Sequence, residues 1–221
     1  LQGKKPALGK EIGTIVKKGV EVPTYAGAGT PLIGVYKQGV DGKGRPSDIM
    51  RAIFYAVKHG AKVINMSFSL ERAPRGVRWA VAYATLRGVI CVASAGNQNQ
   101  ETLVYPAAFL PVVGVAATTL EDTRAPFSNF GDRLVTVAAP GVDLVTTYPA
   151  CRYATVSGTS YSTALVSGAT ALLAGVNPRL RPGSVNAAFK SSWYISEELG
   201  HGRIDLTEAV AATGRRPRWR R

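Results

Sequence analysis

The chain has 221 residues, of which 46% are hydrophobic and 19% are charged, a balance that predicts one compact domain with a sizeable core. No run of about eighteen apolar residues occurs, so we expect no membrane-spanning helix. Residues 1–6 carry charge, but the apolar segment of a secretory leader does not follow them. Because the first residue is Leu1 rather than Met, we expect a processed chain or a piece of a longer one.

The formal net charge of +13 is concentrated at the two ends of the chain. Residues 1–20 carry a net charge of +4 and residues 215–221 carry +5, which leaves +4 for the body. A basic terminal run is typical of a solvated tail, so we expect one domain over residues 1–213 and a tail over 214–221. The alternative is a contact with nucleic acid in which Trp219 stacks, but the rest of the chain resembles no nucleic-acid module, and we expect no such partner.

Short apolar segments alternate with helical patterns, which favours an α/β fold with a mainly parallel sheet flanked by helices. The predicted strands lie near residues 32–36, 62–67, 89–93, 112–117 and 134–138. The predicted helices lie near residues 48–58, 74–87, 160–174 and 183–192. For the first helix we expect Ser47 as the N-cap and Gly60 as the C-terminal stop. The glycines at 27 and 29 lack the third glycine of a dinucleotide-binding loop and indicate a turn.

Residues 157–173 predict a glycine-containing turn that leads into a long apolar helix and places Ser160 in its first turn. Unpaired backbone N–H groups and the helix dipole favour a developing negative charge there, which suits a serine nucleophile. The alternative is that Ser160 only caps the helix. The block Gly158-Thr159-Ser160, with Val166-Ser167-Gly168 downstream, resembles the nucleophile block of the subtilisin-like serine proteases, the subtilase family.

Further blocks follow the order of that family. The strand ending in Ala95-Gly96-Asn97 resembles the oxyanion block, so the resemblance implies that Asn97 donates a hydrogen bond to the reaction intermediate. The alternative for Asn97 is a turn residue with positive φ after Gly96. Residues 127–131 and 137–141 resemble structural blocks, for which core and turn chemistry is a sufficient account. The resemblance covers the C-terminal two-thirds of a subtilase catalytic domain and implies the subtilisin-like three-layer fold.

The resemblance also implies a polypeptide substrate bound as an extended strand between residues 67–69 and 93–96. Beyond Ser160 and Asn97, the implied substrate-binding residues are Ser67, Phe68, Ser69, Ala93, Ser94, Ala95, Gly96, Tyr105 and Thr159. The family has glycines soon after the residue equivalent to Ser67, whereas this chain has Ser69-Leu70.

A serine nucleophile needs an imidazole base, and that base needs a carboxylate to orient it. In the family both precede the oxyanion block, but the two histidines of this chain, His59 and His201, do not match the family's position. Three aspartates have simpler explanations than catalysis: a turn residue for Asp41, an acid in the first turn of a helix for Asp48 and a loop charge for Asp132. Counting back from Ser67 places the family's His-Gly-Thr helix start at residues 8–14, where Leu8 replaces the histidine.

Two functional hypotheses follow. In the first, the chain is an N-terminally incomplete serine endopeptidase whose missing segment supplies Asp and His. In the second, it is an inactive subtilase homologue, a pseudoprotease that binds peptides or serves as a structural domain. We expect no cofactor, and no acidic cluster has the spacing of a calcium site.

Cys91 and Cys151 do not define a disulfide framework, and Cys91, in an apolar strand, is expected to be a buried free thiol. The resemblance implies a secreted or periplasmic protein.

Overall fold

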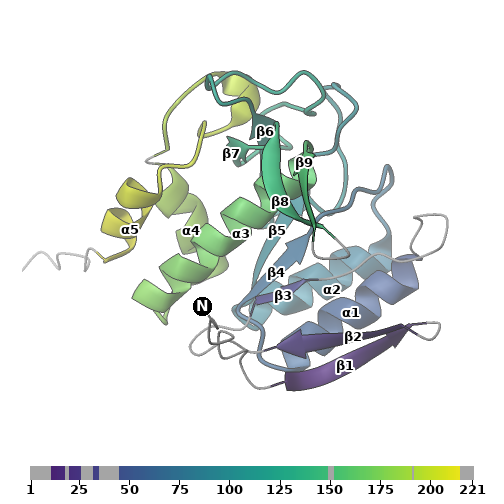
Figure 1. The fold of residues 1–221 in the computed structure, drawn as a ribbon. Helices are drawn as coiled ribbons and strands as arrows, with labels where there is room; N and C mark the ends of the chain where they lie inside the picture. The colour runs from purple at the N-terminus through teal and green to yellow at the C-terminus, as the bar shows by residue number, and fades with distance from the viewer. Residues whose placement is uncertain are drawn as a thin grey trace, which may run out of the picture.

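The computed structural model describes residues 11–17, 20–25, 32–34, 45–148, 152–190 and 192–214. Its centre is a parallel sheet of five strands that lie side by side in chain order (Figure 1). The strands are β3 (Leu32–Gly34), β4 (Val63–Met66), β5 (Ile90–Ser94), β6 (Val113–Thr118) and β7 (Val137–Pro140). Because all five run in the same direction, the loops that follow them meet at one edge of the sheet.

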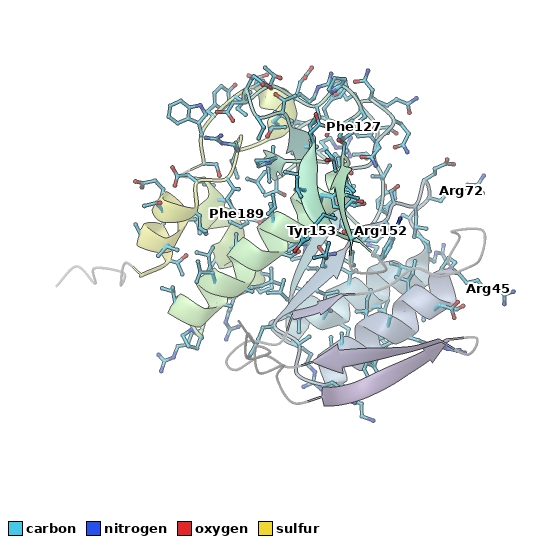
Figure 2. All side chains as sticks on the ribbon, viewed as in Figure 1. Arg45, Arg72, Phe127, Arg152, Tyr153 and Phe189 are labelled. Carbon is cyan, nitrogen blue, oxygen red and sulfur yellow. The ribbon has the colours of Figure 1, made fainter. Side chains whose placement is uncertain are left out.

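Helices cover both faces of this sheet, which produces the three layers seen in Figure 1. Helices α1 (Pro46–Lys58) and α2 (Arg75–Leu86) lie on one face. Helices α3 (Thr159–Val176), α4 (Pro182–Phe189) and α5 (Leu206–Gly214) lie on the other. The alternation of β5 explains the two cores: Cys91 and Ala93 pack toward α1 and α2, whereas Ile90 and Val92 pack toward α3. Phe189, labelled in Figure 2, is fully buried in the second core.

The α/β fold with a parallel sheet and flanking helices is therefore confirmed, with corrections at element boundaries. The strand expected at 134–138 is β7 at Val137–Pro140, because the N–H groups of Leu134 and Val135 donate to the Gly131 carbonyl in a turn. The last predicted helix ends at Phe189 rather than at residue 192. Ser47 is not the N-cap of α1, which begins at Pro46 after the extended residue Arg45. Gly60 ends that helix as expected, with a φ of +81°.

Two antiparallel hairpins were not predicted. Strands β1 (Glu11–Lys17) and β2 (Val20–Tyr25) pair with each other, as do β8 (Leu144–Tyr148) and β9 (Arg152–Val156). The helix start expected at residues 8–14 is wrong for residues 11–14, which lie in β1. Residues 8–10 fall outside the described part of the chain. A short 3-10 helix, η1 (Glu197–Leu199), precedes α5.

Some expectations fall on residues that the structure does not describe. These are the turn at 27–29, residues 35–36 of the first strand, Asp41, Cys151 and residues 215–221 of the tail. Gly214, placed in the tail from the sequence, is the last residue of α5. Within the described residues, no helix combines the length and the apolar character needed to cross a bilayer.

Cys91 lies on β5 with 1% of its surface exposed, and burial raises the pKa of its thiol from 9.0 to about 12. We expect that in a Cys151→Ser variant the folded protein does not react with a thiol reagent at pH 8 and releases one thiol on unfolding. Because the folded state holds the proton more tightly, this group's contribution to stability is lost as pH rises from about 9 to about 12. Rapid labelling of the folded variant at pH 8 would contradict the buried position.

Candidate functional site

The first turn of α3 presents Ser160 at the edge of the sheet where the strands end. Gly158 precedes the helix with a φ of +152°, a conformation that favours glycine, and Thr159 is the first helical residue. Ser160 therefore lies inside the helix, and no side-chain cap bond is present, so the capping alternative is wrong. Ser160 is half-buried, and its backbone N–H makes no hydrogen bond to another described residue. A free donor at a helix N-terminus is suited to an anionic partner.

Asn97 lies directly beside this helix start. Its side-chain oxygen accepts hydrogen bonds from the Thr159 backbone N–H at 2.9 Å and from the Thr159 hydroxyl at 2.8 Å. Among the described residues, the positive-φ residues of this loop are Gly96, at +98°, and Asn99, at +55°, and not Asn97. The alternative of a positive-φ turn residue is therefore wrong for Asn97, and Asn99 fills that role.

The two Thr159 bonds fix the orientation of the Asn97 amide. A backbone N–H can only donate, so the atom that faces Thr159 is the amide oxygen and the –NH2 group points away. That nitrogen lies beside Gly158, where it would be 3.6 Å from a Cβ atom on that residue, and no other described residue accepts its hydrogen bonds. Two unoccupied donors, the Asn97 amide and the Ser160 N–H, therefore lie close together at the start of α3.

Thr159 itself is 1% exposed, and its hydroxyl donates to Asn97 and accepts the Gly96 N–H at 3.3 Å. The resemblance assigns Thr159 to substrate binding, but this hydroxyl is enclosed by protein partners. Its observed role is to hold the loop that contains Gly96 and Asn97 against the start of α3.

Asn129 is a second residue that orders this loop. It is fully buried, and its side-chain oxygen accepts the N–H groups of Gln98 and Gln100 at 3.0 and 3.1 Å. Its –NH2 group donates to the Ala95 carbonyl at 2.9 Å. From the sequence, core and turn chemistry is a sufficient account of the block that contains Asn129. Its hydrogen bonds to Gln98 and Ala95, which lie 31 and 34 positions earlier in the chain, cannot be seen in that block.

Replacing Asn129 by leucine is expected to lower the free energy of unfolding by about 2–4 kcal/mol, because buried polar groups of the loop lose their partners. Urea unfolding measures this change. Gln100→Ala is the matched control. The Gln100 side chain is exposed and bonds to no other described residue, and the backbone bond to Asn129 stays, so the expected change is within about 0.5 kcal/mol. Equal stability of the two variants would show that Asn129 does not order the loop.

The residue that follows β4, Ser67, also contacts α3. The Ser67 hydroxyl donates to the Ser160 carbonyl at 3.1 Å and accepts from the Asn65 amide at 2.9 Å. The buried Ser167 hydroxyl donates to the Asn65 oxygen at 2.9 Å. This chain of polar contacts fixes α3 against β4, a link that the sequence blocks do not predict.

The remaining residues expected to bind substrate fall into two groups. Phe68 is buried in the core, whereas Ser69 is exposed, and its backbone bonds to no other described residue. Leu70 and Tyr105 exchange backbone hydrogen bonds of 2.7 and 2.9 Å, which brings Tyr105 beside this segment. Tyr105 is half-buried, with its ring centroid 4.7 Å from that of Phe109.

The segment from Ala93 to Gly96 is buried, and the backbone groups of its last two residues are occupied. The Ala95 N–H donates to Val115, and the Gly96 N–H donates to Thr159. Both carbonyls accept hydrogen bonds from Asn129. Ala95 and Gly96 therefore form a fixed wall and have no free backbone group with which to pair a substrate strand.

Neither histidine lies at this edge of the sheet. His59 follows α1 and precedes β4, and its ring stacks on Tyr55 with centroids 3.9 Å apart. The His201 N–H donates to the carbonyl of Thr136, the residue before β7. Both therefore lie at the starts of strands, whereas Ser160 lies where the strands end, and a strand of four or five residues is about 13–17 Å long. Burial, together with Lys190, lowers the pKa of His201, but its position does not allow contact with Ser160.

The described aspartates considered from the sequence do not lie beside Ser160 either. Asp48 lies in the first turn of α1, as expected, and Asp132 is exposed in the turn that precedes β7. Within the described residues, no group of three or more His, Cys, Asp or Glu side chains could hold a metal ion.

Comparisons with known proteins identify the family to which this chain is related. A family model described as the subtilase family matches residues 24–205. A thermophilic serine proteinase from Bacillus sp. (strain AK1) is 42% identical over 184 residues, which are 82% of this chain and 45% of that protein. Thermitase from Thermoactinomyces vulgaris is 40% identical over 172 residues, 76% of this chain and 61% of that protein. The chain thus spans about half the length of the curated relatives that it matches.

Solved structures agree with the sequence comparison. The self-cleaved protease domain of PatA has a TM-score of 0.72 and 29% identity, with 76% of this chain and 68% of that chain covered. A protease from Pseudoalteromonas arctica PAMC 21717 has a TM-score of 0.73 and 28% identity, with 77% of this chain and 60% of that chain covered. From the arrangement at α3, the family match and these neighbours, the chain belongs to the subtilase family of serine proteases.

Proposed function

We propose that the chain is the nucleophile-bearing part of a subtilisin-type serine endopeptidase. The observation that carries the proposal is the pair of free donors, the Ser160 N–H and the Asn97 amide, at the start of the helix that bears the Ser160 hydroxyl. In such a site the donors stabilise the charge that develops on the carbonyl oxygen when the serine attacks.

The proposed reaction is hydrolysis of a peptide bond in two stages. The Ser160 oxygen attacks the carbonyl carbon and gives its proton to a base, and the new oxyanion lies between the Ser160 N–H and the Asn97 amide. The carbon–nitrogen bond then breaks, the base returns the proton to the leaving amine, and the acyl group stays on Ser160. Water hydrolyses that ester and regenerates the hydroxyl.

We propose that the substrate pairs with residues 67–69 alone, and not with residues 93–96 as well. The exposed Ser69 has free backbone groups, whereas Ala95 and Gly96 have none, so an extended peptide would pair with residues 67–69. The wall formed by Ala95, Gly96 and Tyr105 would then border the side chain at the cleavage site.

The base must come from outside these 221 residues, because both histidines of the chain lie at the other edge of the sheet. Helix α3 offers a surface for the polypeptide that carries it. Leu165 and Leu172 are each 48% exposed and Val176 is 45% exposed, and their spacing places them along one side of the helix that starts beside Ser160. An apolar segment that packs on this side could hold a histidine at Ser160. Export from the cytoplasm is a further expectation from the family resemblance.

Labelling with a fluorophosphonate probe tests the proposal. In the protein isolated from its natural source, in whatever assembly it forms there, we expect labelling that maps to Ser160 and is much faster than for the recombinant 221-residue chain. The second candidate, a pseudoprotease that keeps the groove without catalysis, is favoured by the absence of a nearby histidine. If the natural protein is folded and Ser160 stays unlabelled, the inactive candidate is correct and the peptidase proposal fails.

A further inference from the structure

The outer surface of α1 and α2 combines basic and apolar side chains far from the candidate active site. Six of its exposed residues, four basic and two apolar, form what we call the basic–apolar face: Arg51, Lys58, Arg75, Arg87, Trp79 and Leu86. Figure 1 shows that this layer lies on the side of the sheet opposite α3. The face is therefore separate from the helix that bears Ser160.

The two helices present these residues as one surface because they pack closely. The Met50 side chain of α1 lies directly against Gly76 of α2, at the place where a Cβ atom on that glycine would project. Phe54 of α1 meets the rings of Trp79 and Tyr83 edge-on, with centroids 5.6 and 5.2 Å apart. The contact with Phe54 thus places the exposed indole of α2 against α1.

The apolar part of the face is unusually open. Trp79 is 66% exposed although its ring contacts Phe54, and Leu86 is 85% exposed on the same side of α2, two turns further along. Such side chains lose free energy in water and gain it when an apolar surface covers them. The residue types are those found where a protein meets the interfacial region of a lipid bilayer, with an indole and an aliphatic side chain among arginines.

The charge of the face is one-sided. Arg75 and Arg87 lie near the two ends of α2, which contains no acidic residue, and Arg51 and Lys58 flank Phe54 on α1. The acidic residue of α1, Asp48, lies in the first turn of that helix. Figure 2 shows Arg45 and Arg72 at the same end of the layer, near the starts of the two helices. The face therefore attracts an anionic partner.

We propose that the basic–apolar face binds the surface of a membrane that contains anionic phospholipids. The arginines and Lys58 would contact lipid phosphates while Trp79 and Leu86 enter the interfacial region. A bilayer explains the face better than a nucleic acid does. Leu86 has no ring on which a base could stack, and a phosphate backbone would not cover its apolar surface. The contact leaves the edge that carries Ser160 free.

Sedimentation with phosphatidylcholine vesicles, with and without 30 mol% phosphatidylglycerol, tests this proposal on the full chain. We expect binding only to the anionic vesicles, and loss of most of it between about 0.1 and 0.5 M salt. Because each basic residue near such a surface contributes about fivefold, Arg75→Gln with Arg87→Gln should weaken binding about 25-fold. The matched control, Arg179→Gln with Arg181→Gln, removes the same charge from exposed positions near α4 and should change binding less than about twofold.

A second pair of variants separates the apolar contribution from net charge. Leu86→Ser should weaken vesicle binding roughly tenfold, whereas Leu120→Ser, at a position that is 70% exposed elsewhere, should have no effect. The proposal is overturned if both arginine pairs weaken binding equally, since the chain's net charge alone would then explain it. It is also overturned if Leu86→Ser binds like the unaltered protein, or if the protein binds a DNA oligonucleotide but not the anionic vesicles.

Discussion

Replacing Ser160 by alanine is expected to abolish peptidase activity and fluorophosphonate labelling of the natural assembly. The reason is that in the proposed mechanism Ser160 supplies the atom that attacks the carbonyl, and its backbone N–H is one of the two free donors. Subtilisin is itself the enzyme in which this loss was measured, at about a million-fold in kcat. The measurement is hydrolysis of an unstructured protein substrate, with mass spectrometry to locate the label.

Ser157→Ala serves as the control for this variant. Ser157 is an exposed serine three positions earlier, and its hydroxyl accepts the Asp143 N–H at 2.9 Å. Its loss should leave labelling intact. Labelling that persists in Ser160→Ala, or that maps to another residue, would show that the nucleophile lies elsewhere.

Replacing Asn97 by alanine is expected to lower kcat by about 100- to 1,000-fold with little change in KM, a loss first measured in subtilisin. The amide –NH2 group is free in the structure, and it would gain its partner only when the carbonyl oxygen becomes negative. Steady-state kinetics on a peptide substrate separates the two constants.

Asn99→Gly is the matched control for Asn97→Ala. Asn99 lies in the same loop with a positive φ that glycine tolerates, and its oxygen bonds to Arg124 rather than to α3. Its replacement should change kcat by less than about threefold, because it removes no donor from the site. A rise in KM with unchanged kcat for Asn97→Ala would mean that Asn97 binds the substrate before reaction and is no oxyanion donor.

The sequence predicts the sheet well because its strands are buried and short. β5 and β6 consist mostly of Val, Ile and Ala, and every residue in them is buried, as expected for strands of a parallel sheet covered on both faces. The error at β7 has a physical cause: Leu134 and Val135 are apolar because they are buried in the core, yet their N–H groups close a turn on Gly131. An apolar run alone does not distinguish a strand from a buried turn.

The candidate site could be predicted in part. Asn97 stands out because it follows a glycine turn after a predicted strand of the parallel sheet, and Ser160 because a glycine-containing turn places it in the first turn of a predicted apolar helix. The residues that hold them could not be found in this way. Thr159 reaches Asn97 across 62 positions and Asn129 reaches the same loop across 31, and no local pattern encodes which buried polar groups will meet. The positions of His59 and His201 likewise required the fold, since only the sheet direction shows that both lie at the opposite edge.

The most direct test of the account is a crystal structure of the natural assembly after reaction with a small organophosphorus inhibitor. We predict a covalent bond from the inhibitor phosphorus to the Ser160 oxygen. We also predict that the phosphoryl oxygen lies about 2.7–3.1 Å from both the Asn97 side-chain nitrogen and the Ser160 backbone nitrogen. A phosphoryl oxygen directed away from Asn97, or phosphorus attached to another residue, would contradict the proposed mechanism.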